Sequence, residues 1–287
     1  LQGAREHNLQ GIDVAIPLQR LVGITGVSGS GKSTLIQDVL FPALAKHFGQ
    51  PSEVPGAFTG LAGLEQLKGV VMVDQSPIGK SARSNPVSYV GAWDAIRKLY
   101  ANLDESKERG YTPGTFSFNS GTGRCPTCTG SGFEHVEMQF LSDVYLRCPD
   151  CDGKRYRPEI LALSWRGKGV ADVLEMTVSE ALAFFADQKA VQAALAPLAD
   201  VGLEYLRLGQ PVPTLSGGEA QRLKLAGYLA EAAQLATKKA KKGAAGEAEP
   251  GLLFLFDEPT TGLHFEDVAT LLSAFEKLLD AGHSLVV

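Results

Sequence analysis

The segment from Gly26 to Ser33 most constrains the fold of this chain, because its sequence GVSGSGKS matches a phosphate-binding loop. The motif G-x-x-x-x-G-K-[ST] requires a strand before it and a helix after it. Residues 22–25 have the composition of a buried strand, and residues 32–46 carry apolar side chains at helical spacing. Loop glycines and the helix N-terminus surround phosphate oxygens with N–H groups. The sequence therefore predicts an α/β fold that binds a nucleoside triphosphate.

The roles within this loop follow from the chemistry of phosphoryl transfer. Lys32 is expected to reach the β and γ phosphates, and Ser33 is expected to ligate Mg²⁺. The predicted nucleotide contacts of the loop are Gly26, Ser28, Gly29, Ser30, Gly31, Lys32, Ser33 and Thr34. A chance glycine-rich turn is the alternative, and the strand and helix on either side of the loop disfavour it.

A second apolar stretch, residues 252–256, ends in Asp257 and Glu258. Five apolar residues suit a central parallel strand that is buried on both faces. Since α/β sheets bind ligands at the carboxyl ends of their strands, Asp257 is expected to hold the magnesium and its water shell. Glu258 is expected to polarise an attacking water as general base. A plain helix start is the alternative for Asp-Glu-Pro, and the upstream phosphate loop favours the catalytic role.

Residues 215–222, LSGGEAQR, are predicted to open a helix. Ser216, Gly217 and Gly218 would present free N–H groups to an anion at that helix end. Ser216 and Glu219 also match a capping box, in which each residue bonds the backbone of the other. The two roles are compatible, because a capped helix end can also bind phosphate.

Together with Gln75, these blocks resemble the ATP-binding-cassette (ABC) ATPases. In that family the signature helix of one cassette completes the ATP site of another, so the resemblance implies a composite site. It also implies that Gln75 contacts the metal and the attacking water, and that residues 260–264 contact the facing cassette. The expected catalytic residues are Glu258, Lys32 and Gln75. The expected magnesium ligands are Ser33, Gln75 and Asp257, and the expected nucleotide contacts beyond the loop are Gln75, Ser216, Gly217, Gly218 and Asp257.

All four cysteines lie between Gln75 and the signature segment, in two C-x-x-C pairs with 19 residues between them. This spacing is typical of zinc sites, and four thiolates form a closed, tetrahedral, structural site. Disulfides and free thiols are the alternatives, and a reducing cytosol disfavours the disulfides. Alternating apolar residues over 134–147 predict a β-hairpin that the metal holds at its base. The predicted zinc ligands are Cys125, Cys128, Cys148 and Cys151.

The charge of this region differs from that of the whole chain. Residues 80–168 contain 13 Lys and Arg against 10 Asp and Glu, whereas the chain carries a net charge of −5. Basic residues with an interleaved aromatic residue suit contacts with nucleic-acid phosphates and bases. A solvated basic face is the alternative. The predicted DNA contacts are Lys80, Arg83, Lys154, Arg155 and Arg157.

Longer motifs narrow the resemblance to the UvrA family, the ATPases of bacterial nucleotide excision repair. They are DQSPIGK at 74–80, RSNP at 83–86, RGYTPG at 109–114, FSFN at 116–119 and the two cysteine pairs. The match extends from GAREHNL at 3–9 to the last strand and corresponds to the second cassette. It implies an ATPase that senses damaged or distorted DNA and hands it to UvrB. The implied cofactors are ATP, Mg²⁺ and Zn²⁺, and the implied partners are lesion-bearing duplex DNA, UvrB and a second cassette from the same polypeptide or a homodimer.

Three other functions stay open. A UvrA-like paralogue in tolerance of DNA-binding drugs would suit the low-complexity stretch 237–251, expected to be a surface loop, and the residues Phe254 and Phe256. A transporter motor is disfavoured by the 140 residues between Gln75 and Ser216, which carry the zinc motif. A peptide-binding module is the third, because residues 125–132 resemble the knuckles of DnaJ chaperones. No apolar run reaches membrane-spanning length and no leader is evident, so a cytoplasmic protein is expected.

The predicted architecture is an α/β, P-loop, ABC-type ATPase core with an inserted, mostly helical signature domain that carries a four-cysteine zinc β-hairpin module. Residues 1–79 are expected to form the first part of the core, with an antiparallel strand over Ile12–Ile16. Residues 80–209 are expected to form the insert, with helices over 87–100, 178–185 and 191–198 and the zinc module over about 118–160. Residues 210–287 are expected to complete the core, ending before the switch histidine of a longer polypeptide.

Overall fold

The computed structural model describes residues 1–79, 81, 83–136, 138, 144–242, 250–261 and 263–287. Within it the chain forms two compact units. The first contains Leu1–Gln75 and Glu231–Val287, and the second contains Ser76–Ala230. The first unit thus holds the phosphate loop and the acidic strand, and the second holds the cysteines. The functional division at residues 79/80 and 209/210 stays a prediction.

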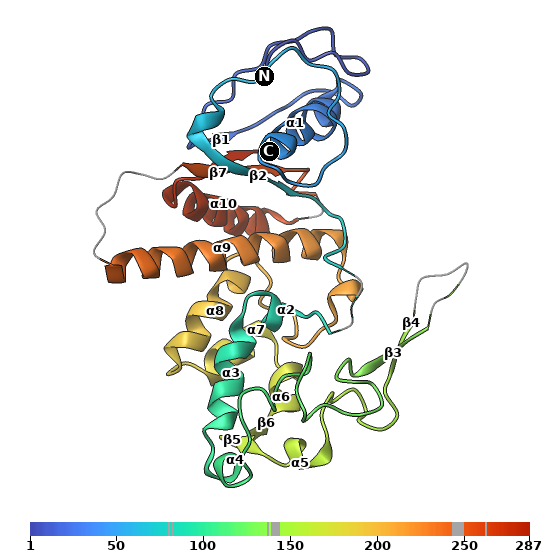
Figure 1. The fold of residues 1–287 in the computed structure, drawn as a ribbon, viewed down its shortest axis with the longest axis vertical. Coiled ribbons are helices and arrows are strands. Elements are labelled where there is room, and N and C mark those ends of the chain that lie inside the picture. Colours follow the sequence, from blue (N-terminus) through green and yellow to red (C-terminus); the bar gives the residue numbers. More distant parts are fainter. Residues whose placement is uncertain (80, 82, 137, 139–143, 243–249, 262) are drawn as a thin grey trace. The chain divides into compact units, whose positions relative to one another are not determined.

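The first unit is built on a four-stranded parallel sheet with the strand order β1-β8-β7-β2 (Figure 1). The strands are β1 (Leu21–Val22), β2 (Leu67–Val73), β7 (Gly251–Phe256) and β8 (Ser284–Val286). β7 lies between β8 and β2 and is buried along almost its whole length, which explains its run of large apolar residues. The predicted α/β class and the predicted acidic strand are thereby confirmed.

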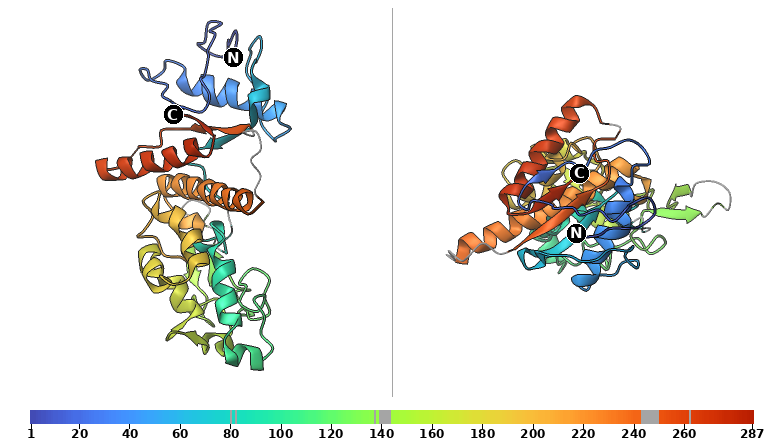
Figure 2. Two further views of the ribbon diagram at one scale, coloured as in Figure 1. Left: turned by 90° about the vertical axis from the view of Figure 1, so that its left-hand side faces the viewer. Right: turned by 90° about the horizontal axis from the view of Figure 1, so that it is seen from above.

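Helices cover both faces of this sheet. The phosphate loop leads into π-helical turns over Thr34–Leu40 and then into α1 (Phe41–His47), whose apolar sides pack against β2 and β7. On the other face lies α10 (Phe265–Asp280), and its Phe275 ring is 4.6 Å from the ring of Phe256. Figures 1 and 2 show the sheet between α1 and α10. The sequence predicts a regular α-helix after the loop, and the π-helical turns differ from it.

Two strand predictions for this unit are wrong. Ile12–Ile16 is not a strand, because only Ile12 forms an isolated antiparallel bridge, to Ala4. Asp13 accepts the Gly3 N–H on its side chain at 2.7 Å, and Val14 exchanges backbone hydrogen bonds with Leu1, so the segment is held by separate contacts with residues 1–4 rather than by a continuous ladder. The strand predicted over residues 22–25 is the short, partly exposed edge strand β1, not a buried one.

The second unit is mostly helical, as predicted. Its elements are α2 (Pro86–Tyr89), α3 (Ala92–Ala101), α4 (Asp104–Glu108), α5 (Pro158–Leu161), α6 (Val170–Glu175), α7 (Val178–Phe184), α8 (Lys189–Ala199), the 3₁₀ turn Val212–Thr214, and two small hairpins, β3 (Phe133–Val136) with β4 (Val144–Arg147) and β5 (Ser164–Trp165) with β6 (Lys168–Gly169). The single helix predicted over 87–100 is broken between α2 and α3, where Gly91 has a φ of 77°.

Aromatic side chains form the core that joins the helices of this unit to the cysteine segment. Trp93 of α3 donates its indole N–H to the carbonyl of Phe116 at 3.1 Å, and Tyr156 donates its hydroxyl to the same carbonyl at 2.6 Å. Phe118 lies between them, with its ring 5.4 Å from that of Trp93 and 6.5 Å from that of Tyr156. The residues that follow the second cysteine pair are therefore anchored in the same core as α3.

The helix α9 (Gly217–Lys242) begins at the signature segment and corrects one prediction. Part of the stretch 237–251, expected to be a loop, continues this helix to Lys242. Alanine and lysine are strong helix formers, so low complexity here extends a helix rather than ending it. Residues 243–249 lie outside the described part of the chain. Among the described residues, no helix is both long and apolar enough to cross a membrane.

Candidate nucleotide site and metal centre

The phosphate loop is an exposed turn whose backbone is held open by two glycines. Gly29 and Gly31 have φ values of 78° and 94°, which side-chain-bearing residues rarely adopt. The Lys32 ammonium donates to the carbonyl oxygens of Gly26 at 2.8 Å and Val27 at 3.0 Å. This places the lysine charge directly at the loop, where N–H groups and the helix N-terminus favour an anion. The geometry is suited to the phosphates of a nucleotide.

Asn8 contacts the same loop, and no sequence motif assigned it a role there. Its side-chain amide donates to the carbonyl of Gly29 at 2.9 Å. A Cβ at Gly31 would lie 2.8 Å from the Asn8 Oδ1 atom, so the side chain also requires the glycine there. Asn8 is 18 positions before Gly26 in the sequence, and its only signal was its place in the family motif at residues 3–9.

Asp257 and Glu258 lie at the carboxyl edge of the sheet. In the register of β2 and β7, Val73 is paired with Phe256, and the Asp257 N–H donates to the Val73 carbonyl at 3.4 Å. Gln75, two residues beyond Val73, therefore leaves the sheet at the same edge as the acids. All four strands are parallel, so the phosphate loop that follows β1 also emerges at this edge.

Glu258 has an unusual backbone conformation for a non-glycine residue. Its φ is 43°, and its exposed carboxylate accepts a bond from the Thr261 hydroxyl at 3.2 Å. Left-handed backbone is costly for such a residue and is common at functional positions. The turn presents an accessible carboxylate just beyond the strand end, as a general base for water requires.

Ser216 and Glu219 form the predicted capping box at the start of α9. The Glu219 carboxylate accepts the Ser216 N–H at 2.8 Å, and the Glu219 N–H bonds the Ser216 hydroxyl at 3.3 Å. Tyr205, which no sequence motif singles out, donates its hydroxyl to Glu219 at 2.9 Å. The Ser216 N–H is therefore not free for an anion, whereas no heavy atom of the described residues lies within 4 Å of a Cβ built on Gly218, so there is space beside that glycine. Contact of this end with ATP stays a prediction.

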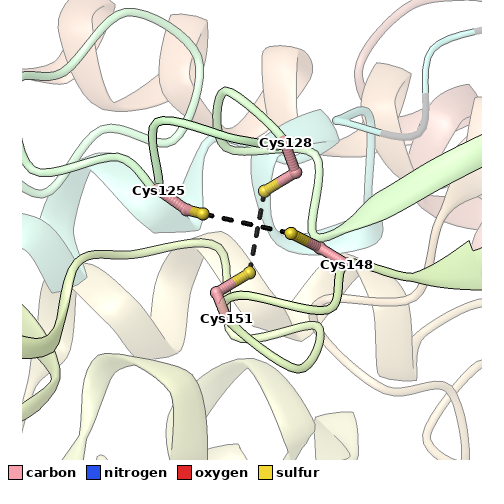
Figure 3. Close-up of side chains that lie close together, drawn as sticks. All are labelled: Cys125, Cys128, Cys148 and Cys151. Atoms are coloured by element: carbon pink, nitrogen blue, oxygen red, sulfur yellow. Dashed lines mark hydrogen bonds between the residues drawn. The ribbon is translucent and has the colours of Figure 1, made fainter.

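The four cysteines lie close together, with their Sγ atoms pointing toward one point (Figure 3). All are buried, and the four sulfurs lie within 4.8 Å of one another. The Cys125 and Cys148 sulfurs are 4.0 Å apart, and those of Cys128 and Cys151 are 3.6 Å apart. A tetrahedral zinc with Zn–S bonds of about 2.3 Å places its sulfurs about 3.8 Å apart. The residues therefore fit a zinc ion, and the separations are too long for disulfides.

Backbone N–H groups point at these sulfurs, as metal-bound thiolates require. Gly132 N–H and Arg155 N–H lie 3.3 Å from the sulfurs of Cys128 and Cys151, respectively. Burial raises the pKa of the Cys128 thiol and of the Cys151 thiol. For Cys125, burial acts in the same direction, but the N–H groups of Cys128 and Thr127 outweigh it and lower the pKa. A cation would favour the thiolate forms of Cys128 and Cys151 against this burial.

The β-hairpin predicted between the cysteine pairs is confirmed. β3 and β4 are antiparallel, with Phe133 paired with Arg147 at the base and Val136 paired with Val144 at the far end. Residues 137 and 139–143 of the predicted range lie outside the described residues. Val136, Val144 and Leu146 leave 39%, 40% and 52% of their surfaces exposed.

The five residues predicted to contact DNA differ in their exposure. Lys80 lies outside the described residues. Lys154 and Arg157 are exposed, whereas Arg83 is half-buried and donates to the Thr129 hydroxyl at 2.6 Å. The prediction that Arg155 contacts DNA is wrong, because only 2% of its surface is exposed. Its guanidinium donates to the Gly209 carbonyl at 2.8 Å and lies over the Phe118 ring, so it is part of the interior and not of a DNA surface.

The fold and these sites define a class of protein. A parallel sheet with a phosphate loop and an acidic strand at one edge is a P-loop ATPase core. The signature helix and Gln75 make it a core of the ABC type, and the four-cysteine module lies in the segment between them. No protein-family model matches the chain.

Known proteins of this class cover the chain from end to end. It is 51% identical over 287 residues, all of this chain and 29% of the relative, to UvrABC system protein A of Thermus thermophilus. It is 50% identical over 285 residues, 99% of this chain and 28% of the relative, to UvrABC system protein A of Mycobacterium tuberculosis. The crystal structure of UvrA2 from Deinococcus radiodurans is 46% identical and superposes with a TM-score of 0.82, covering 99% of this chain and 32% of that one.

The chain is a segment of the UvrA family, the family of ABC ATPases that the sequence motifs resembled. It spans less than a third of the length of the relatives it matches. The prediction of the family is confirmed.

Proposed function

We propose that this chain belongs to an ATP-dependent DNA-binding subunit that senses damaged or distorted DNA in nucleotide excision repair. The observation that carries the proposal is the 51% identity to UvrABC system protein A over the whole chain, including the cysteine module between Gln75 and the signature segment. The 140 residues between Gln75 and Ser216, which carry the cysteine module, disfavour a transporter motor. The cytoplasm is the expected compartment.

ATP binding would use the phosphate loop, and Mg²⁺ would be held by Ser33, Gln75 and Asp257. When bound, the metal would offset the negative charge of the phosphates. Lys32 would bind the terminal phosphates, and Glu258 would accept a proton from the attacking water. Ser216 and the glycines after it would bind the ATP of a facing cassette, supplied by the same polypeptide or by a second copy. The exposure of Ser216 and the space beside Gly218 support this role.

DNA contact would use the exposed basic residues of the second unit, with Arg155 removed from the set. Neutralising phosphates with Lys154 and Arg157 makes binding strongly salt-dependent and nearly independent of base sequence. We expect the combined Lys154→Ala and Arg157→Ala variant of the full-length protein to bind DNA more weakly, with a shallower salt slope and with its zinc retained. Unchanged affinity and an unchanged slope would place the DNA surface elsewhere.

A UvrA-like paralogue in tolerance of DNA-binding drugs is the second candidate, supported by the likeness to UvrA2 at 46% identity. UvrB is the expected partner of the repair subunit. Co-purification of UvrB with the full-length protein would favour the repair subunit over the paralogue.

The test of the proposed function is a fluorescence-anisotropy titration of lesion-bearing and intact duplex with the full-length protein, with and without ATP. We expect tighter binding to the lesion-bearing duplex and a change in that preference when ATP is added. Equal affinity for both duplexes under all nucleotide conditions would overturn the proposal.

A further inference from the structure

Arg155 is held by both cysteine pairs at once. Its N–H points at the Cys151 sulfur at 3.3 Å, and its carbonyl accepts the Cys125 N–H at 2.9 Å. Its φ of 72° is a left-handed conformation that a residue of this size avoids without support. These two bonds provide the support, so the backbone of Arg155 depends on an intact four-cysteine module.

The side chain of Arg155 reaches the segment that leads into the signature helix. Its guanidinium is buried, lies 5.2 Å from the centre of the Phe118 ring, and donates to the Gly209 carbonyl at 2.8 Å. Burial lowers the pKa of Arg155 to about 10, so it remains a cation at neutral pH. A buried cation needs compensation, and the groups that favour the charged form of Arg155 include Tyr156, Glu175 and the cysteines Cys128 and Cys151.

Gly209 is a fixed point seven residues before Ser216. Its N–H donates to the Leu174 carbonyl of α6 at 2.7 Å, and a Cβ there would lie 2.8 Å from the Leu174 Cβ. The chain then passes through the 3₁₀ turn Val212–Thr214 to the cap of α9. The segment between the Gly209 carbonyl, which Arg155 binds, and Ser216 is thus short and partly fixed by this turn.

A second set of contacts ties the other end of the insert to the same module. The Arg83 guanidinium donates to Thr129, which directly follows Cys128. The carbonyl of the next residue, Ser84, accepts the Val212 N–H at 2.8 Å. The segment that follows Gln75 and the segment that precedes Ser216 are thus bonded to each other, and each is bonded to the cysteine module.

We propose that Arg155 is a positioning residue for the ATP site: it couples the four-cysteine module to the segment 209–216, so that the bound zinc fixes the position of Ser216. This rests on the proposed function only in that Ser216 acts on ATP. The coupling itself lies within the second unit and exists without nucleotide or DNA. Arg83 adds a weaker, partly exposed tie to the same segment.

The test is hydrogen–deuterium exchange of the full-length, zinc-loaded protein without nucleotide. In Arg155→Met, which keeps the stem but not the charge, we expect exchange over residues 209–216 to rise about tenfold, the scale of a lost hydrogen bond to a charged group. Zinc content should stay as in the wild type, and Arg155→Lys should restore part of the protection. Arg147→Met is the matched control, because Arg147 is an exposed neighbour of Cys148 that pairs only loosely, at 3.8 Å, with Asp152.

Removing zinc with a chelator tests the same coupling without a mutation. In the wild type, exchange over residues 209–216 should rise at least as much as in Arg155→Met, and in Arg155→Met the chelator should add only the smaller rise expected from loss of the Arg83–Thr129 contact. Unchanged exchange over 209–216 in zinc-loaded Arg155→Met overturns the proposal. If that variant does not fold, unchanged exchange over 209–216 in the chelated wild type overturns it equally.

A steady-state ATPase measurement separates this proposal from the proposed function. Arg155→Met should lower kcat with little change in the KM for ATP, because the phosphate loop is untouched. A raised KM with an unchanged kcat would contradict the positioning role. A wild-type protein without ATPase activity would contradict the proposed function and leave the exchange result to decide the coupling.

Discussion

The phosphate loop and the four-cysteine module are both ion sites built from short motifs. They differ in burial and in whether one chain supplies all the groups of the site. The cysteine module is buried, and its ligands, its N–H donors and its supporting arginine all come from residues 83–209 of one chain. The phosphate loop is exposed, and apart from its own atoms only Asn8, among the described residues, is seen to hold it. The first site can be complete in this chain, whereas the second leaves one side open for further groups.

This difference has a physical origin. Zinc takes four ligands and has no open position in a structural site, so burial does not impair its function. A nucleotide must enter and leave, and in a composite site its phosphates are closed over by a second surface. The signature serine of this chain is exposed at a helix end of the second unit, available for such a role. Damage to the cysteine module should therefore leave nucleotide binding at the phosphate loop intact, and damage to the loop should leave zinc binding intact.

The largest effect is expected for Cys148→Ser. Removing one of four thiolates should weaken zinc binding by more than the roughly 100-fold that loss of an outer-shell partner costs. Since metal binding here is folding energy, the hairpin β3–β4 should unfold. Zinc content by elemental analysis and exchange over residues 125–157 would measure this. Binding of Mg-ATP should persist, and its loss would show that the two sites are not independent.

Lys32→Ala should have the next largest effect. The variant loses the one cation seen at the phosphate loop among the described residues, so Mg-ATP affinity should fall by about 100-fold. Isothermal titration calorimetry would measure it, with Lys46→Ala, an exposed lysine on α1, as the control. Zinc content should not change. Tight Mg-ATP binding by Lys32→Ala would show that the loop is not part of the ATP site.

A smaller effect is expected for Asn8→Ala. Loss of one neutral hydrogen bond to the loop should weaken Mg-ATP binding by about fivefold, because the loop must then be ordered by the nucleotide itself. Gln10→Ala is the matched control on an exposed neighbour. An affinity for Asn8→Ala equal to that of the control would mean that the glycines alone hold the loop.

The smallest effect is expected for the pH dependence of stability, through a histidine that bonds the central sheet. His283 Nδ1 accepts the Leu252 N–H at 3.1 Å, and burial, with Lys68 nearby, lowers the pKa of His283. The unfolded chain therefore binds the proton more readily, so this stabilisation is present above the ordinary histidine pKa and is lost as the pH falls below it. Chemical unfolding of wild type and His283→Asn across this range should show a shallower pH slope in the variant. His47→Asn, at an exposed position of α1, should keep the wild-type slope, and equal slopes in all three would exclude the effect.

Short motifs predicted much of both sites. The phosphate loop, the acidic strand, the capping box at Ser216 and the clustering of the cysteines all depend on residues a few positions apart, whose geometry local rules describe. The end of the helix over residues 217–242 did not follow from the same rules, because low complexity predicts a loop there while the Ala and Lys side chains themselves favour helix.

The residues whose roles the sequence did not reveal depend on contacts distant in sequence. Arg155 lies between Lys154 and Arg157 in a basic segment that looks exposed in the sequence, and its guanidinium contacts Phe118 and Gly209, 37 and 54 positions away. Asn8 had no local signal because its partner, Gly29, is 21 positions away. Burial and pairing at such distances are set by tertiary packing, which periodicity does not report.

The most direct test of the central claim is to measure zinc content and ATP turnover on the same samples of this 287-residue chain and of the full-length protein. We expect one zinc in the 287-residue chain, at least one in the full-length protein, and turnover by the full-length protein that the 287-residue chain does not approach. Turnover by the isolated chain at the full-length rate would contradict an ATP site that a second cassette must complete.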